Sequence, residues 1–360
     1  MPSNPPRIAK RRAANAVAIT VALAAATAIG ISAMPASAAP AATSRPDGGA
    51  AIAAHQATEA SGFPTFVNLP ADQAAHPVPT EWWYTTGHFT AAGQQYGYLV
   101  DLTAEGLALI SFTDVTTHQY YESEQAFAKG TFSVSSTGLE VRFPDASLTG
   151  PMDNMRLSAQ LPGGHGSLDL TLDAKGPVLY DNGTGLFPLL GGASYYYSLP
   201  NEQTTGTMTF NGKTTPVTGQ SWLDRQWGNW DFGKLDKWTW MGVQLGDDEY
   251  LNLWDVYDNN GEHVWATVLN PDGSENVVAV EPLAPNAGDF QTSPASGQRY
   301  VGRWVVQIPS LHTRLTVTAD PVVQDFPVYQ IDEAISSVSG TFENHPVTGT
   351  ARVEQLGQWN

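Results

Sequence analysis

Two short stretches of the chain bring carboxylates, a guanidinium and indole rings close together in sequence. The first runs Val217-Thr218-Gly219-Gln220-Ser221-Trp222-Leu223-Asp224-Arg225-Gln226-Trp227-Gly228, and the second runs Glu81-Trp82-Trp83-Tyr84-Thr85-Thr86-Gly87-His88-Phe89. In an extended strand, neighbouring side chains point to opposite faces. We therefore expect Asp224 to share a face with Trp222 and Gln226, while Arg225 points to the other face.

A carboxyl group surrounded by indoles could protonate a carbon–carbon double bond. Burial would raise its pKa and make it a usable acid near neutral pH. Aromatic faces could shelter the resulting cation, and a base could activate water. The candidate catalytic residues are Asp224, Glu81, His88, Arg225 and Asp255, with Asp101 as a further proton carrier. The candidate ligand-binding residues are aromatic: Trp82, Trp83, Tyr84, Tyr196, Trp227, Trp238, Trp240, Trp254 and Tyr257.

The same residues could instead have a structural role. Tryptophans that close the end of a barrel, with Arg225 stacked on one of them, would produce the same string. Asp224 could form a buried ion pair with an arginine, and Glu81 a salt bridge at a barrel mouth. His88 could be an ordinary hydrogen-bonded strand histidine. The sequence leaves both the structural plug and the ligand site open.

Several other chemistries lack support in the sequence. The chain has no cysteine, which excludes disulfides and thiolate zinc sites. Its eight histidines contain no pair at i, i+2 or i, i+4 spacing, so we expect no metal site. Ser221 lacks the second glycine of a nucleophile elbow, and no phosphate-binding or dinucleotide fingerprint occurs. We expect no cofactor.

The first 38 residues have the pattern of a secretory signal peptide. A charged start is followed by a run rich in Ala, Val and Ile, and Ala36-Ser37-Ala38 fits a cleavage site. Cleavage is expected near Ala38-Ala39, which predicts a secreted, extracellular protein. Residues 39–62 are rich in Ala, Ser, Pro and Gly and are predicted to be a disordered lead-in.

The remainder of the chain is strongly acidic. Residues 1–38 contain four of the 17 basic residues and none of the 35 acidic ones, which leaves a net charge of −22 on the rest. Nucleic acids and anionic membranes are polyanions and are therefore unexpected partners. No second long apolar run occurs, so no membrane span is expected in the mature chain. The expected partner is a lipophilic small molecule, and the oligomeric state stays open.

Short alternating segments separated by turn residues predict an all-β protein from residue 63 onward. Ser167–Asp173 alternates cleanly, and Trp304–Ile308 is rich in β-branched residues. The dipeptides Asn211-Gly212, Asn260-Gly261 and Asp272-Gly273 favour hairpin turns.

A weak internal repeat divides these strands into two units. Trp82-Trp83-Tyr84 opens one pattern and Trp238-Thr239-Trp240 opens another. The first pattern closes with Pro216-Val217-Thr218-Gly219 and the second with Pro346-Val347-Thr348-Gly349. We therefore predict two tandem antiparallel β-barrels packed together, over residues 63–228 and 229–360.

In this order, the motifs resemble one family. They are Glu81-Trp82-Trp83-Tyr84 with Gly87-His88, Ser194-Tyr195-Tyr196-Tyr197-Ser198, Val217-Thr218-Gly219 with Trp222-Leu223-Asp224-Arg225-Gln226-Trp227-Gly228, and Trp238-Thr239-Trp240. Over residues 63–356 the chain resembles the carotenoid 1,2-hydratase (hydroxyneurosporene synthase) family, with its kievitone-hydratase and secreted lipocalin-like branches. The resemblance implies two lipocalin-like (calycin-type) barrels with a ligand cavity near their interface. It also implies water addition to a carbon–carbon double bond, or cofactor-free cyclisation of a polyketide chain.

The chain departs from this family at one position. Carotenoid hydratases tend to carry His-x-Trp where this chain has Arg225-Gln226-Trp227. Arginine stays protonated and is a poor proton donor, which favours a lipophilic substrate other than a carotenoid. Two functions follow as hypotheses: a secreted hydratase or cyclase acting on a terpenoid or polyketide-like molecule, and a non-catalytic carrier of a hydrophobic small molecule.

Overall fold

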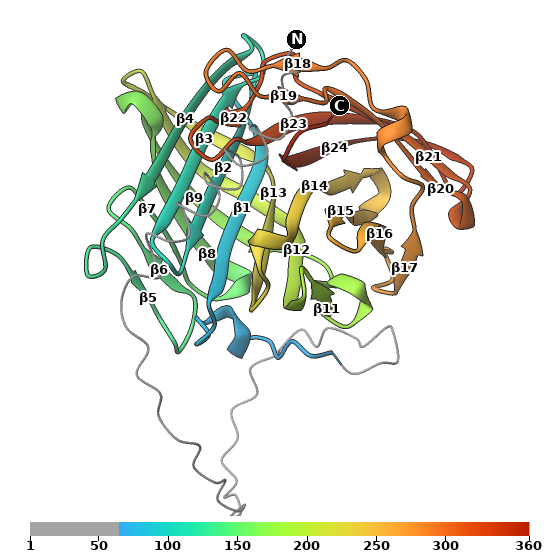
Figure 1. The fold of residues 1–360 in the computed structure, drawn as a ribbon. Coiled ribbons are helices and arrows are strands. Elements are labelled where there is room, and N and C mark those ends of the chain that lie inside the picture. Colours follow the sequence, from blue (N-terminus) through green and yellow to red (C-terminus); the bar gives the residue numbers. More distant parts are fainter. Residues whose placement is uncertain (1–64, 360) are drawn as a thin grey trace, which may run out of the picture.

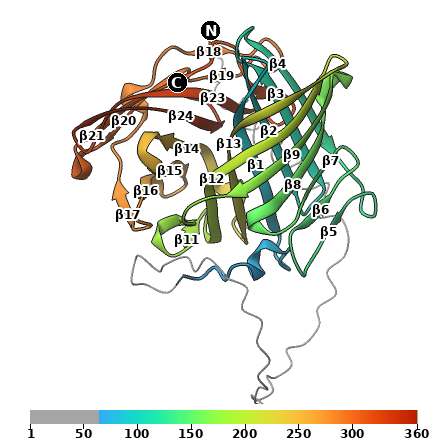
Figure 2. The same ribbon diagram turned by 180° about the vertical axis from the view of Figure 1, so that it is seen from behind.

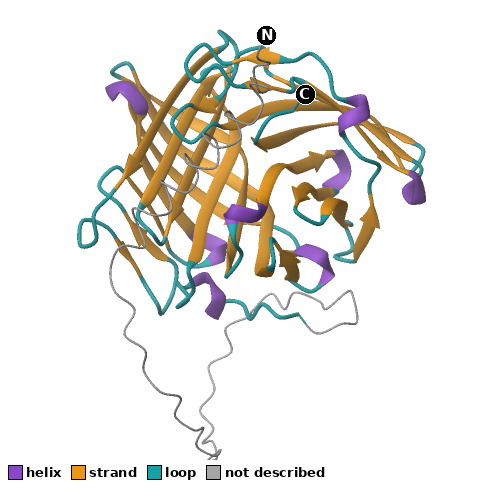
Figure 3. Cartoon of the chain, viewed as in Figure 1, coloured by secondary structure: helices purple, strands orange, loops and turns teal. Residues whose placement is uncertain are grey.

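The computed structural model describes residues 65–359, so the predicted signal peptide and lead-in lie outside the described residues. Within them the chain consists of antiparallel strands and short 3-10 turns, without an α-helix (Figure 3). No helix in this part of the chain is long and apolar enough to cross a bilayer. The 3-10 turns are η1 (Ala71–Gln73), η2 (Met152–Asn154), η3 (Pro162–Gly164), η4 (Asp181–Gly183), η5 (Phe232–Lys234), η6 (Gly246–Asp248), η7 (Ala284–Asn286) and η8 (Pro309–Leu311).

The first part of the chain forms a 13-stranded sheet in the order β4-β3-β2-β1-β13-β12-β9-β8-β7-β6-β5, and β10 and β11 also pair with β12. Its strands are β1 (Thr80–Ala91), β2 (Gln94–Thr103), β3 (Leu107–Asp114), β4 (Gln119–Ala126), β5 (Ser133–Val134), β6 (Glu140–Arg142), β7 (Ala146–Thr149), β8 (Met155–Leu161), β9 (Gly166–Ala174), β10 (Leu179–Tyr180), β11 (Leu186–Leu189), β12 (Gly192–Phe210) and β13 (Lys213–Gly228).

The second part forms a 9-stranded sheet in the order β17-β16-β15-β14-β24-β23-β21-β20, with β22 paired to β23, and β18 and β19 form a separate ribbon. Its strands and those of the ribbon are β14 (Leu235–Leu245), β15 (Tyr250–Asp258), β16 (Gly261–Leu269), β17 (Glu275–Ala279), β18 (Gln291–Thr292), β19 (Arg299–Tyr300), β20 (Arg303–Ile308), β21 (Thr313–Ala319), β22 (Asp325–Phe326), β23 (Ile331–Phe342) and β24 (His345–Leu356).

Both sheets curl strongly, as the two opposite views show (Figures 1 and 2). Neither hydrogen-bonded path closes on itself within residues 65–359: one runs from β4 to β5 and the other from β17 to β20. The predicted all-β fold with two antiparallel barrel-like units is confirmed, and each unit is an open half-barrel.

The predicted repeat has a clear topological counterpart. In the larger sheet β1 lies between β2 and β13, and in the smaller sheet β14 lies between β15 and β24. The closing strands then continue to β12 and β9 in one sheet and to β23 and β21 in the other. The opening strand of each unit is therefore hydrogen-bonded to the closing strand of the same unit.

The repeated Pro-Val-Thr-Gly endings require glycine because the neighbouring strand passes very close. A Cβ added to Gly219 would lie 2.0 Å from the carbonyl oxygen of His88. A Cβ added to Gly349 would lie 2.1 Å from the carbonyl oxygen of Gln244. Both distances are far below van der Waals contact, so a side chain at either position would push two paired strands apart.

Buried apolar side chains form three clusters. One is made by the larger sheet and another by the smaller sheet. The third cluster draws on both sheets and fills the seam between them. This seam cluster holds many of the tryptophans, among them Trp222, Trp230, Trp238, Trp240 and Trp254.

Candidate functional site

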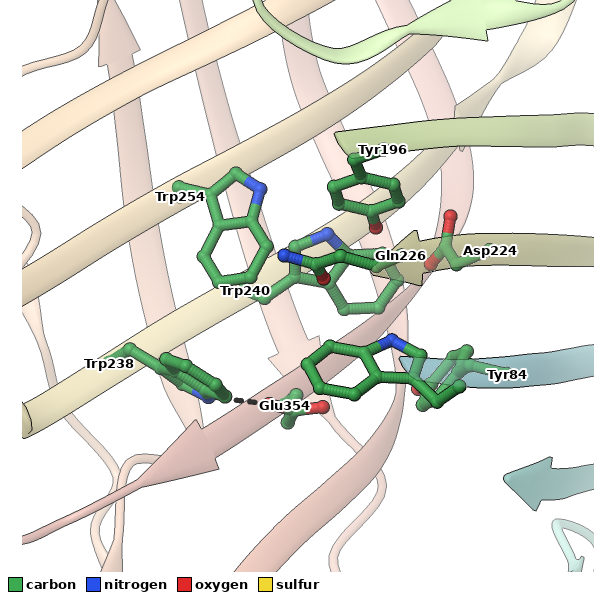
Figure 4. Close-up of a pocket in the computed structure, with 9 residues that line it drawn as sticks. Tyr84, Tyr196, Asp224, Gln226, Trp238, Trp240, Trp254 and Glu354 are labelled. Carbon is green, nitrogen blue, oxygen red and sulfur yellow. Dashed lines mark hydrogen bonds between the residues drawn. The ribbon is translucent and has the colours of Figure 1, made fainter. Parts of the chain in front are cut away.

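A small cavity lies in the seam cluster where the two sheets face each other (Figure 4). It measures about 20 Å³, close to the space that one ordered water occupies. Two of its lining residues, Trp82 and Glu354, are only partly buried and are therefore the lining residues most accessible to solvent. The lining residues are Trp82, Tyr84, Tyr196, Asp224, Gln226, Trp238, Trp240, Trp254 and Glu354.

The larger sheet contributes one wall of this site through the register of its central strands. Asp224 on β13 lies opposite Tyr84 on β1 and opposite Ser198 on β12. Tyr84 in turn lies opposite Asp101 on β2. A row of four residues therefore crosses the sheet at one level.

The smaller sheet contributes the facing wall with an equivalent row. Glu354 on β24 lies opposite Trp240 on β14 and opposite Glu333 on β23. Trp240 in turn lies opposite Trp254 on β15. The two rows meet where the ring of Tyr84 packs edge-on against Trp240, with 5.5 Å between the ring centroids.

Asp224 is the buried acid of the first wall. Its Oδ1 accepts a hydrogen bond from Ser198 Oγ at 2.5 Å and another from Trp222 Nε1 at 2.6 Å. Burial raises the pKa of this carboxyl to about 7, although the hydrogen bonds from Ser198, Trp222 and Tyr196 oppose the rise. Among the described residues no cation forms an ion pair with Asp224. Near pH 7 the group can therefore hold or release a proton.

The second wall holds two carboxyl groups. Glu354 Oε1 accepts a hydrogen bond from Trp238 Nε1 at 2.5 Å, which Figure 4 marks with a dashed line. The hydroxyl of Tyr84 donates to Glu333 Oε2 at 2.7 Å, and Glu333 lies directly opposite Glu354 across β23 and β24. Burial raises the pKa of Glu354 and raises that of Glu333 well above its usual value.

Arg225, on the opposite face of β13 from Asp224, belongs to a structural plug. Its guanidinium lies 4.0 Å from the ring centroid of Trp83 and 5.5 Å from that of Trp227. Arg225 Nη2 donates to Glu81 Oε1 at 2.7 Å, and both side chains are fully buried. The ring of His76 stacks on Trp227, and its Nδ1 lies 2.7 Å from the same Glu81 oxygen.

The two faces of β13 at the Trp-Leu-Asp-Arg-Gln-Trp string therefore have different surroundings. The face with Arg225 forms the plug, and the face with Asp224 lines the cavity. Although burial alone would raise the pKa of Glu81, its hydrogen bond with His76 and the charge of Arg225 hold it below the usual value. Glu81 is consequently ionised at neutral pH and is poorly suited to donate a proton.

Three other candidate residues lie away from the small cavity. His88 lines a separate groove of about 380 Å³ between the two sheets, and burial lowers its pKa to about 4. Asp255 follows Trp254 on β15 and points to the opposite face, where burial raises its pKa to about 7. Tyr257 packs against the core of the smaller sheet and donates to Glu262 Oε1 at 2.6 Å.

The structure thus sorts the candidate residues into three places. Those at the cavity are Asp224, Trp82, Tyr84, Tyr196, Trp238, Trp240 and Trp254. Those in the plug are Glu81, Arg225, Trp83 and Trp227. Those elsewhere are His88, Asp255 and Tyr257.

Glu354, Glu333 and the cavity residue Gln226 were not among the residues predicted from the sequence. A signal for Glu354 was present in the repeat. Asp224 stands five positions after Gly219, and Glu354 stands five positions after Gly349. Aligning the two Pro-Val-Thr-Gly endings would have placed a second acid at the position equivalent to Asp224.

Comparison with known proteins adds an independent line of evidence. Residues 63–330 match the model of a family described as AttH-like. The chain is 26% identical over 290 residues to the kievitone hydratase of Fusarium solani subsp. phaseoli, which covers 76% of this chain and 81% of that protein. It is also 26% identical over 275 residues to dehydratase asqC of Emericella nidulans, covering 69% and 75%.

Two solved structures share the fold. A crystal structure of an AttH protein from Nitrosomonas europaea superposes with a TM-score of 0.71 at 19% identity, covering 83% of this chain and 98% of that one. Kievitone hydratase from Nectria haematococca superposes with a TM-score of 0.67 at 19% identity, covering 84% and 98%. The resemblance inferred from the motifs is therefore confirmed in its kievitone-hydratase branch. Because the family model covers more than half of the 360 residues, the chain belongs to the AttH-like family.

Proposed function

We propose that the protein is a hydratase or dehydratase of a neutral, lipophilic small molecule, with Asp224 as its general acid. The observation that carries the proposal is a protonatable carboxyl group, buried among indoles, that forms no ion pair with any cation of residues 65–359. Support for the reaction class comes from two relatives that are named as a hydratase and a dehydratase. The signal-like residues 1–38 further suggest action outside the cell.

In hydration, the Asp224 carboxyl group would transfer its proton to one carbon of the double bond. The O–H bond of the acid breaks as the new C–H bond forms, and the other carbon becomes cationic. The indole rings of Trp240 and Trp254, which line the cavity together with Asp224, could shelter that cation. The oxygen of a water molecule then bonds to the cation, and its surplus proton passes to a base. Dehydration runs through the same steps in reverse.

The substrate must be neutral and must open the site before it reacts. A cavity of about 20 Å³ has no room for an organic molecule, so binding requires the lining rings to move apart. Trp82 is partly exposed at the mouth and is the aromatic residue best placed to move first. The carboxyl groups on both walls would repel an anionic substrate.

The proposal is tested by incubating the purified protein with extracts and with kievitone as the first defined probe. Products are compared by mass spectrometry for gain or loss of one water. The matched control is Asp224→Asn, which keeps the shape and hydrogen-bond acceptor of the side chain but has no transferable proton. A product that has gained or lost one water, formed by the unsubstituted protein but not by Asp224→Asn, supports the proposal. A compound that is bound and released unchanged favours the carrier function.

A further inference from the structure

We propose that Glu354 is a second acid–base residue of this site and that Glu333 is the neighbouring carboxyl group that shares one proton with it. The inference rests on the proposed function, because it assigns the base that a hydratase needs in addition to its acid. Glu354 lines the cavity and can touch a substrate, so it is a candidate catalytic residue. Glu333 does not line the cavity and acts through Glu354, so it is a positioning residue.

The two acids, Asp224 and Glu354, occupy equivalent positions in the two half-barrels. Each lies on the closing strand of its sheet, opposite an aromatic residue of the opening strand: Asp224 opposite Tyr84, and Glu354 opposite Trp240. Each also accepts a hydrogen bond from an indole N–H group. The donor is Trp222 for Asp224 and Trp238 for Glu354. A repeat that places one acid on each wall provides both a proton donor and a proton acceptor around one substrate.

Glu333 and Glu354 are cross-strand neighbours on β23 and β24. From this pairing, and from the effect of each carboxyl group on the pKa of the other, we infer a hydrogen bond between them. Two carboxylates have no hydrogen to share, so this contact requires one proton between them. Tyr84 already donates its hydroxyl hydrogen to Glu333 and Trp238 donates to Glu354, so neither outer contact can supply that proton.

The charges that face the pair favour the state with one proton. Arg352 lies on the same face of β24, and its three donor nitrogens bond to Thr86 Oγ1, the Tyr98 carbonyl and the Glu333 carbonyl. Its positive charge balances a single negative charge on the pair. Burial and the nearby Glu354 raise the pKa of Asp101 on β2 well above its usual value, which indicates that a further negative charge is unfavourable in this region. We therefore assign one proton and one negative charge to the pair, because burial raises the pKa of both carboxyl groups and the charge of Arg352 offsets a single negative charge.

This arrangement assigns the proton transfers of the proposed reaction. During hydration Asp224 gives its proton to carbon, and the attacking water gives its surplus proton to the carboxylate of Glu354. One water has then been added, Asp224 is a carboxylate and Glu354 is neutral. A proton leaves Glu354 and another returns to Asp224 through solvent at the mouth, which restores the starting state. In dehydration the roles of the two carboxyl groups are exchanged.

The proton pair can be tested without any substrate, because each acid has its own indole reporter. In protein labelled with ¹⁵N-tryptophan, the Nε1–H resonance of Trp238 reports on Glu354 and that of Trp222 reports on Asp224. The variants Trp238→Phe and Trp222→Phe assign the two signals. In the unsubstituted protein, a coupled pair should shift the Trp238 signal in two separate steps as the pH is raised. Trp222 should show its own step near pH 7.

The discriminating variant is Glu333→Gln, which keeps an acceptor for Tyr84 but cannot share a proton. It should reduce the two Trp238 steps to one, while the Trp222 step stays in place and shows that the protein is folded. A single Trp238 step with the same midpoint in both proteins would overturn the pair.

The catalytic role has a separate readout. On a substrate that Asp224 turns over, Glu354→Gln should reduce kcat by about 10²-fold. Glu333→Gln should shift the pH profile of kcat, which a merely structural residue would not do. Loss of turnover in Asp224→Asn but not in Glu354→Gln would overturn this inference and leave the proposed function standing. Full turnover in Asp224→Asn would overturn the proposed function itself.

Discussion

Asp224 and Glu354 occupy equivalent positions on the closing strands of the two half-barrels and line the same cavity from facing walls. Each follows the glycine of a Pro-Val-Thr-Gly ending by five positions. Neither half-barrel contains the site alone, because each contributes one wall and one acid. The docking of the two sheets is therefore what creates the site, and the repeat is what makes it two-sided.

Replacing Asp224 by asparagine should separate catalysis from folding. Asn Oδ1 can still accept the hydrogen bonds from Ser198 and Trp222, and no buried cation loses a partner. Turnover should fall by about 10²-fold or more, the usual scale for loss of a general acid. The free energy of unfolding should change by less than about 1 kcal/mol. Product formation and a urea unfolding curve on the same preparation check both expectations; a large loss of stability with normal turnover would show that Asp224 is structural.

Replacing Glu81 by glutamine should lower the stability of the protein and leave its turnover unchanged. The change leaves Arg225 charged and fully buried without its carboxylate partner. Removing one member of a buried pair costs about 3–5 kcal/mol, so the urea midpoint should fall sharply. Turnover per folded molecule should be unchanged because the plug lies on the opposite face of β13.

A double variant provides the control for this ion pair. In Glu81→Gln with Arg225→Met no uncompensated charge remains, and the methionine can still pack between Trp83 and Trp227. Part of the lost stability should return. An equal loss in the single and double variants would mean that packing, rather than charge, holds the plug together.

Stability should fall as the pH rises from about 4 to above 7. Burial raises the pKa of Asp224, Asp255 and Asp332 from the usual aspartate value of 3.8 to about 7 each. In this window the folded chain binds more protons than the unfolded chain, so each group's contribution is complete below the unfolded pKa and is lost as the pH passes the folded pKa. Each group changes the free energy of unfolding by up to about 1.4 kcal/mol per pH unit.

Urea unfolding at pH 5 and pH 8 measures this dependence. The midpoint should be higher at pH 5, and Asp332→Asn, which changes a buried residue that does not line the cavity, should flatten the slope. A midpoint that rises between pH 5 and pH 8 would show that these carboxyl groups ionise normally in the folded chain.

Gly349→Ala should destabilise the smaller sheet, and Gly219→Ala should destabilise the larger one by a similar amount. In both cases the new methyl group would meet a neighbouring strand's carbonyl oxygen at about 2 Å. The expected cost is about 2 kcal/mol or more, because paired backbones must shift. Gly138→Ala is the matched control, since a Cβ there would have no atom within 4 Å. Thermal unfolding that treats all three variants alike would contradict the close approach.

Local patterns in the sequence were sufficient to predict the strands and their turns. The Asn211-Gly212 dipeptide forms the two-residue loop between β12 and β13, with φ of 49° and 79°. Ser167–Asp173 lies within β9. Alternation also separated Asp224 from Arg225 correctly, because a strand sends neighbouring side chains to opposite faces whatever surrounds it. These features depend on residues close together in the chain.

The identity of the site depended on contacts between strands that are distant in the chain. Tyr84 is hydrogen-bonded to Glu333, although 249 positions separate the two residues in the chain. Periodicity indicates which side chains share a face but not whether that face meets a core, a plug or a cavity. His88 and Asp255 illustrate the point: both looked suitable in sequence, and sheet docking put them elsewhere. Only the packing of one curled sheet against the other sets those surroundings, because burial and charge depend on all the atoms that arrive from both sides.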